Sequence, residues 1–135
     1  MSIFVSLRVY ENNTLYNREE TLLLYFKEAI IMLFIKKWIW AKKVKEFEDG
    51  KKTLETLKNR YVGWSVVRGL YPGHIIERYD EILTEATTLY DAAEGAFISE
   101  DFKRALNTID KAIVSLDVQK DIYNMAIIIL KGVSI

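Results

Sequence analysis

The stretch from Leu22 to Trp40 constrains the fold most, because it is apolar on nearly every side of a helix. It reads LLLYFKEAIIMLFIKKWIW. Lys27 and Ile31 share one face, four residues apart, and Lys36 lies roughly opposite Lys27, so no side is polar throughout. A helix that is apolar nearly all round is buried on several sides. The stretch therefore predicts either the central helix of a bundle or a helix with a second contact surface for another subunit, a partner or a membrane.

The composition excludes several classes of functional site. The 135 residues are enough for one domain, and half of them are hydrophobic, which is enough for a core. The chain has no cysteine, so it has no disulfide framework, thiolate metal site or cysteine nucleophile. His74 is the single histidine, which excludes a multi-histidine metal site. We therefore expect no metal and no cofactor.

The sequence predicts an intracellular protein. The opening MSIFVSLRVY has no basic region followed by a small-residue cleavage site, so we expect no signal peptide. The longest uncharged apolar run of the first helix, Ala29 to Ile35, is far shorter than the ~18 residues that a membrane span needs. A virus particle is a location that the sequence also allows.

Charge is distributed unevenly along a chain whose formal net charge is zero. Residues 1–68 hold 13 Lys and Arg against 8 Asp and Glu, or +5, and residues 69–135 hold 6 against 11, or −5. Such asymmetry favours self-association or an anionic partner, although the two halves of one bundle can also neutralise each other. Abundant Lys and Glu with a single glutamine and a single proline resemble the composition of thermophile proteins.

Residues 1–13 predict an extended N-terminal arm. Apolar residues alternate with Ser6 and Arg8 over the first ten positions, which is the period of a strand. One strand cannot satisfy its own hydrogen bonds. The arm would therefore pair with another copy or lie on the bundle.

Residues 14–135 predict a single all-α domain, an antiparallel four-helix bundle. Apolar side chains recur at three- and four-residue steps through four segments. Asp49-Gly50, Gly69 with Pro72, and Gly95 separate these segments, and Ser99 would cap the last one. A restart at Asp117 would split that last helix and give five. The predicted helices cover residues 17–49, 52–68, 74–94 and 99–131.

Two segments, 22–40 and 122–130, are more apolar than an isolated bundle needs. They favour a non-enzymatic protein that acts through a homodimer or through another protein partner. A structural component of a larger assembly, such as a virus particle, fits the same pattern. The predicted interface residues are Ile31, Ile35, Trp38, Trp40, Ile127 and Ile128.

Residues 36–45, KKWIWAKKVK, form the one cluster that mixes basic and aromatic side chains. Lys36, Lys42 and Lys43 are candidate contacts for an anion such as a nucleic-acid phosphate. A membrane surface would also suit such a cluster, although we do not favour it. The alternative is that the two tryptophans cover the end of the core beneath the lysine stems.

Arg68 and His74 are five residues apart in RGLYPGH, the link between the second and third predicted helices. This spacing is similar to the Arg-x(4–6)-His signature of HEPN-domain ribonucleases, which are helical bundles that cleave RNA at a dimer interface. The motif departs from that family, because Gly69 replaces a polar neighbour and Pro72-Gly73 breaks the helix. The resemblance implies an alternative function, an RNA-binding or RNA-cleaving bundle in which Arg68 and His74 act on the RNA backbone.

Overall fold

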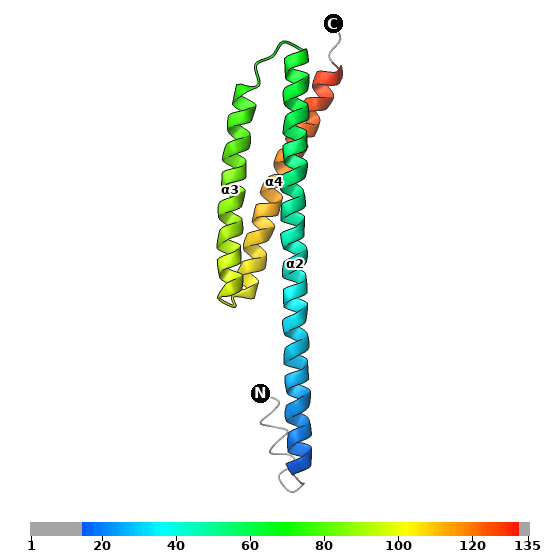
Figure 1. Cartoon of the computed structure of the whole chain (residues 1–135), viewed down its shortest axis with the longest axis vertical. Coiled ribbons are helices and arrows are strands. Elements are labelled where there is room, and N and C mark those ends of the chain that lie inside the picture. The colour runs from blue at the N-terminus through cyan, green and yellow to red at the C-terminus, as the bar shows by residue number, and fades with distance from the viewer. Residues whose placement is uncertain (1–14, 133–135) are drawn as a thin grey trace. The chain divides into compact units, whose positions relative to one another are not determined.

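The computed structural model describes residues 15–132, and it is helical almost throughout. Three helices make up this part of the chain, namely α2 (Leu15–Val67), α3 (Gly73–Ile98) and α4 (Phe102–Gly132) (Figure 1). The all-α prediction is therefore confirmed, and the prediction of four or five helices is wrong. The strand predicted within residues 1–13 lies outside the described residues.

The predicted break at Asp49-Gly50 does not exist, because α2 continues through it. Gly50 has a helical backbone and is buried against α4, where an added Cβ would lie 3.4 Å from Leu116 Cδ1. The glycine therefore lies inside a helix, beside a contact between two helices, and does not end one. A glycine inside a helix costs about 1 kcal/mol relative to alanine.

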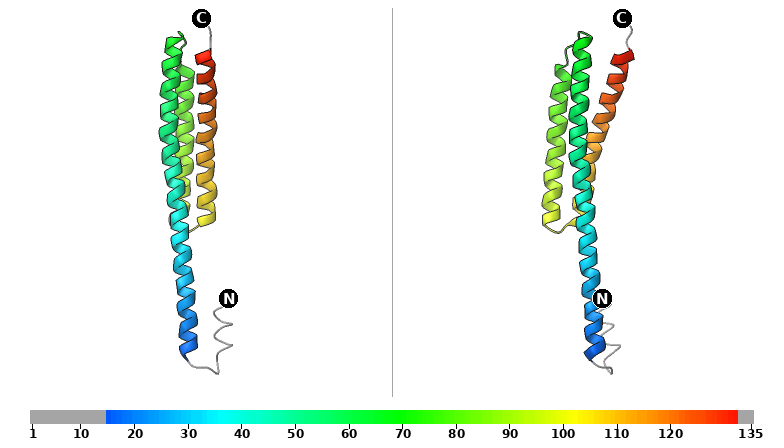
Figure 2. Two further views of the ribbon diagram at one scale, coloured as in Figure 1. Left: turned by 90° about the vertical axis from the view of Figure 1, so that its right-hand side faces the viewer. Right: turned by 45° about the vertical axis from the view of Figure 1, so that its right-hand side comes forward.

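The chain divides into two compact units, one that ends at Ile39 and one that spans Trp40–Ile135. In the second unit, called here the helical unit, the carboxyl-terminal part of α2 packs with α3 and α4 around a shared core. Figure 2 shows that α3 runs antiparallel to both of these helices within this unit. The largest fully buried side chains come from α2 and α4: Phe47, Leu54, Ile109, Leu116 and Tyr123.

An aromatic stack fixes the register of α2 against α3. Trp40 stacks on Phe97 with ring centroids 4.8 Å apart, and Phe47 stacks on Tyr90 at 4.7 Å. Trp40 also lies parallel to Tyr90 at 6.4 Å. Trp40 and Phe47 are seven residues apart in α2, and Tyr90 and Phe97 are seven residues apart in α3. Two turns along each antiparallel helix therefore lead from one stacked pair to the next. Offset aromatic pairs add about 0.5–1.5 kcal/mol beyond the area that they bury.

The helix ends of the helical unit have identifiable chemical causes. After α2, Gly69 adopts a φ of 72°, and Leu70 N–H donates to Ser65 O at 2.8 Å, which is a Schellman motif. The same motif ends α3, where Asp101 N–H donates to Ala96 O at 2.9 Å. Its left-handed residue is Glu100, with a φ of 66°. The predicted end of the second helix near Gly69 is therefore confirmed.

Two predicted boundaries around the α3–α4 turn are wrong. Gly95 lies inside α3, which extends to Ile98. Ser99 caps the carboxyl end of α3, and Asp101 caps the start of α4, where its Oδ1 accepts a hydrogen bond from Arg104 N–H at 3.3 Å. Helix α4 then runs unbroken to Gly132, so Asp117 starts no fifth helix.

Candidate functional site

The first candidate surface is the apolar segment, residues 23–38 of α2, where eleven large apolar side chains are exposed. Three of the predicted interface residues lie in it: Ile31 is 55% exposed, Ile35 43% and Trp38 62%. Apolar surface at this density is unusual on a monomer, which makes the segment a candidate contact surface. The other exposed side chains are Leu23, Leu24, Tyr25, Phe26, Ile30, Met32, Leu33 and Phe34.

Trp40 and Ile127 are core residues, in contrast to the other predicted interface residues. Trp40 is 9% exposed in the aromatic stack, and Ile127 is 6% exposed in the core formed by all three helices. Ile128, one residue further along α4, is 68% exposed. The apolar run around 122–130 therefore serves the core on one side and faces outward on the other.

The second candidate surface is the outer stripe of α4, which the sequence analysis did not identify as a whole. Its five side chains are between 48% and 64% exposed and follow one another at steps of four, four, three and four residues. This spacing places them in one row along the helix. The three- and four-residue spacing of these apolar residues, visible in the sequence, could have predicted the stripe. The stripe consists of Val114, Val118, Ile122, Met125 and Ile129.

Of the predicted anion contacts, Lys43 is paired with acidic side chains inside the helical unit. Lys43 Nζ lies 2.8 Å from Asp110 Oδ1 of α4 and 3.7 Å from Glu46 Oε2. The hydrogen bond to Asp110 raises the pKa of Lys43 above its ordinary value, against a smaller opposing effect of burial. Lys43 thus holds α2 to α4. Lys36 and Lys42 are exposed on α2.

Arg68 binds the carboxyl end of α4. Its Nε donates to Leu130 O at 2.9 Å and its Nη2 to Lys131 O at 3.3 Å, while the guanidinium lies over the Trp64 ring at 5.8 Å. The last carbonyls of a helix accept no hydrogen bond from an N–H group of the same helix, so Arg68 supplies donors for them. His74 is exposed in the first turn of α3. The position of Arg68 is thus explained by helix capping.

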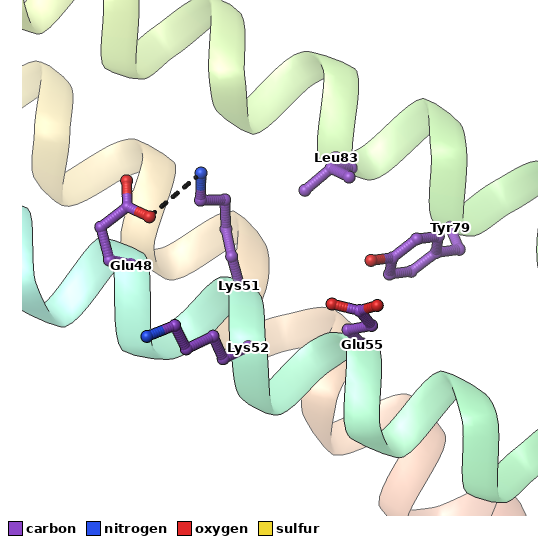
Figure 3. A pocket seen from close by; sticks show the side chains of 6 residues that line it. All are labelled: Glu48, Lys51, Lys52, Glu55, Tyr79 and Leu83. Carbon is purple, nitrogen blue, oxygen red and sulfur yellow. Dashed lines mark ion pairs between the residues drawn. The ribbon is translucent and has the colours of Figure 1, made fainter.

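The surface grooves of the helical unit, among the residues that the structure describes, include two open ones. One, of about 280 Å³, lies between α2 and α4 beside Gly50, and the other, of about 270 Å³, lies between α2 and α3. In the second groove, Lys51 Nζ pairs with Glu48 Oε2 at 3.3 Å, and burial raises the pKa of the Tyr79 phenol. Figure 3 shows that Tyr79 and Leu83 come from α3, that the four charged side chains come from α2, and that Glu55 lies beside the Tyr79 ring. The complete lining is Glu48, Lys51, Lys52, Glu55, Tyr79 and Leu83.

The side chains of the second groove lie between two packed helices and offset one another in charge. Two lysines and two glutamates balance the charge of the second groove. Lys58 Nζ also lies over the Tyr79 ring at 4.5 Å, which covers one face of that ring. Among the residues that the structure describes, no group of three or more acidic or histidine side chains is placed to hold a metal ion.

Within residues 15–132, no helix combines the length and the apolar character that crossing a membrane requires. Comparison of the chain with protein-family models, with curated proteins and with solved structures finds no match.

Proposed function

We propose that this chain is a non-enzymatic helical protein that acts by associating with further copies of itself as part of a larger structural assembly. The observation that carries the proposal is the apolar segment of α2, with eleven exposed large apolar side chains in sixteen consecutive residues. A virus particle is one assembly of this kind. A different protein partner would use the same surface.

The free energy available from this surface supports an assembly with several contacts per chain. Burying the exposed half of one large aliphatic side chain contributes about 1 kcal/mol. One neighbouring helix covers only about half of the segment, so two copies gain roughly 10 kcal/mol from a single helix pair. Association itself costs about 4–15 kcal/mol. A lone pair of helices is therefore marginal, so association needs a high protein concentration or more than one such contact per chain.

The sharpest test replaces Leu33 and Ile35 with glutamate. Residues two apart lie on opposite sides of a helix, so one of the new charges meets any contact that the segment makes. A matched control places the same charges on α3, in Ile76→Glu/Ile98→Glu, where the two isoleucines are 38% and 73% exposed. Sedimentation velocity over a range of concentrations measures the association of each protein.

We expect Leu33→Glu/Ile35→Glu to weaken association at least tenfold, while the control assembles as the wild type does. Helix content by circular dichroism should be unchanged in both variants, because the substituted side chains lie outside the core. Equal association of the wild type and Leu33→Glu/Ile35→Glu would refute a role for the apolar segment.

A further inference from the structure

Helix α4 has two apolar faces, and the helical unit uses only one of them. The core face contains Ala105, Ile109 and Leu116, which are at most 1% exposed. The outer stripe lies on the other side, with Val118 54% and Met125 64% exposed. A helix at the surface of a monomer needs a single apolar face. The outer stripe therefore requires an explanation outside the core of its own unit.

An acidic row runs along one edge of the outer stripe. Asp110, Asp117 and Asp121 are separated by seven and four residues, which places them on one side of the helix. Lys43 reaches Asp110 from α2, and Lys120 Nζ lies 2.7 Å from Asp117 Oδ1. The remaining aspartate, Asp121, is exposed. The edge of the stripe thus favours a partner that combines apolar and basic side chains.

The apolar segment of α2 has both properties. Residues 23–38 contain Lys27, Lys36 and Lys37 against one acidic residue, Glu28, for a net charge of +2. Pairing two such segments with each other would bring like charges together, whereas pairing a segment with the outer stripe brings opposite charges together. The lengths also agree, because residues 23–38 and 114–129 each span about 24 Å of helix at ~1.5 Å per residue.

We infer that the outer stripe of α4 is the docking surface for the apolar segment of α2 from a second copy of this chain. The inference rests on the proposed function and specifies which two surfaces meet. Each copy then carries one segment and one stripe, so the contact joins unlike surfaces. Contacts of this kind propagate into a ring or an open filament.

Mixing two variants tests this arrangement. In Leu33→Glu/Ile35→Glu the segment is defective and the stripe is intact. In Val118→Glu/Met125→Glu the stripe is defective and the segment is intact. We expect each variant alone to be monomeric at concentrations where the wild type assembles. An equimolar mixture should form a dimer of one copy of each and grow no further, because only one intact segment and one intact stripe remain to meet.

Each contrary result has a distinct meaning. Wild-type assembly by Val118→Glu/Met125→Glu, or a mixture that stays monomeric, would overturn the docking surface and leave self-association standing. A monomeric wild type would overturn the proposed function as well, whether or not it binds vesicles of anionic phospholipid. If Val118→Glu/Met125→Glu melts below the wild type, Val118→Ser/Met125→Gln replaces it in the same mixture.

The acidic row supplies an independent measurement. Asp121→Lys should weaken wild-type association several-fold at low salt, and the difference should shrink at high salt because exposed charges are screened. Glu85→Lys makes the same charge reversal on the exposed surface of α3 and serves as the control. An equal effect of both substitutions would show that net charge, not the edge of the stripe, governs association.

Discussion

Replacing Gly50 with alanine tests whether α2 is one helix, because the two possible backbones predict opposite signs. In a continuous helix, alanine is favoured over glycine by about 1 kcal/mol. The new methyl group would lie 3.4 Å from Leu116 Cδ1 and 3.9 Å from its Cβ, which is ordinary van der Waals contact. Burying that methyl contributes up to about 0.8 kcal/mol. We therefore expect Gly50→Ala to stabilise the helical unit by about 1–2 kcal/mol, combining the two contributions.

Thermal unfolding followed by circular dichroism measures this change, which corresponds to a rise in Tm of about 4–8 °C per kcal/mol in a domain of this size. Two further glycines provide controls, Gly63 in the same helix and Gly69 just beyond its end. Gly63 has no atom within 4 Å of an added Cβ, so Gly63→Ala reports helix propensity alone. Gly69 has a φ of +72°, so Gly69→Ala should lower stability by about 1 kcal/mol.

If a helix ended at Gly50 and Gly50 had a left-handed backbone, Gly50→Ala would lower stability as Gly69→Ala is expected to do. Destabilisation of about 1 kcal/mol or more by Gly50→Ala, with Gly63→Ala stabilising as expected, would refute the continuous helix. The comparison between the three glycines therefore decides the backbone state at Gly50.

Three further results are expected in the helical unit. Arg68→Ala removes the donors to the last carbonyls of α4 and should lower stability by about 1 kcal/mol, with faster amide hydrogen exchange confined mainly to the last turns of α4; unchanged exchange there would contradict the capping role. Glu100→Gly removes the strain of a left-handed φ of 66°. It should raise the free energy of unfolding by up to about 1 kcal/mol and therefore raise the Tm; a lower Tm would contradict this. Burial raises the pKa of Tyr123, and the ion pair with Asp110 raises that of Lys43. Both groups hold their protons more tightly when folded, so their stabilisation is complete below their unfolded pKa values and is lost as the pH rises past about 10. Thermal melts at stepped alkaline pH measure this loss, which Tyr123→Phe should reduce.

Part of the fold could be predicted from local chemistry. The end of α2 was recognisable because Gly69 supplies the left-handed backbone that its Schellman motif requires. The same reasoning failed at Gly50 and Gly95, where glycine has a helical backbone. What distinguishes Gly50 is its contact with Leu116, sixty-six positions along the chain. A contact over such a distance in sequence leaves no local signal.

The candidate surfaces could also be predicted only in part from the positions of residues around their helices. Trp38 and Trp40 are two residues apart, yet one is exposed and the other lies in the core. Trp40, Phe47 and Leu54 follow one another at seven-residue steps and are all buried, so this spacing identifies Trp40 as the core tryptophan. The outer stripe of α4 was not predicted as a whole, because only its carboxyl-terminal part, within residues 122–130, was recognised as surplus apolar surface.

Self-association is tested most directly by the mass of the wild-type protein in solution, measured by light scattering after size exclusion over a hundredfold range of concentration. The apolar segment and the outer stripe predict a dimer or larger species whose mass rises with concentration. A mass that stays at 15.8 kDa throughout, at both low and high salt, would contradict self-association as the function of these surfaces.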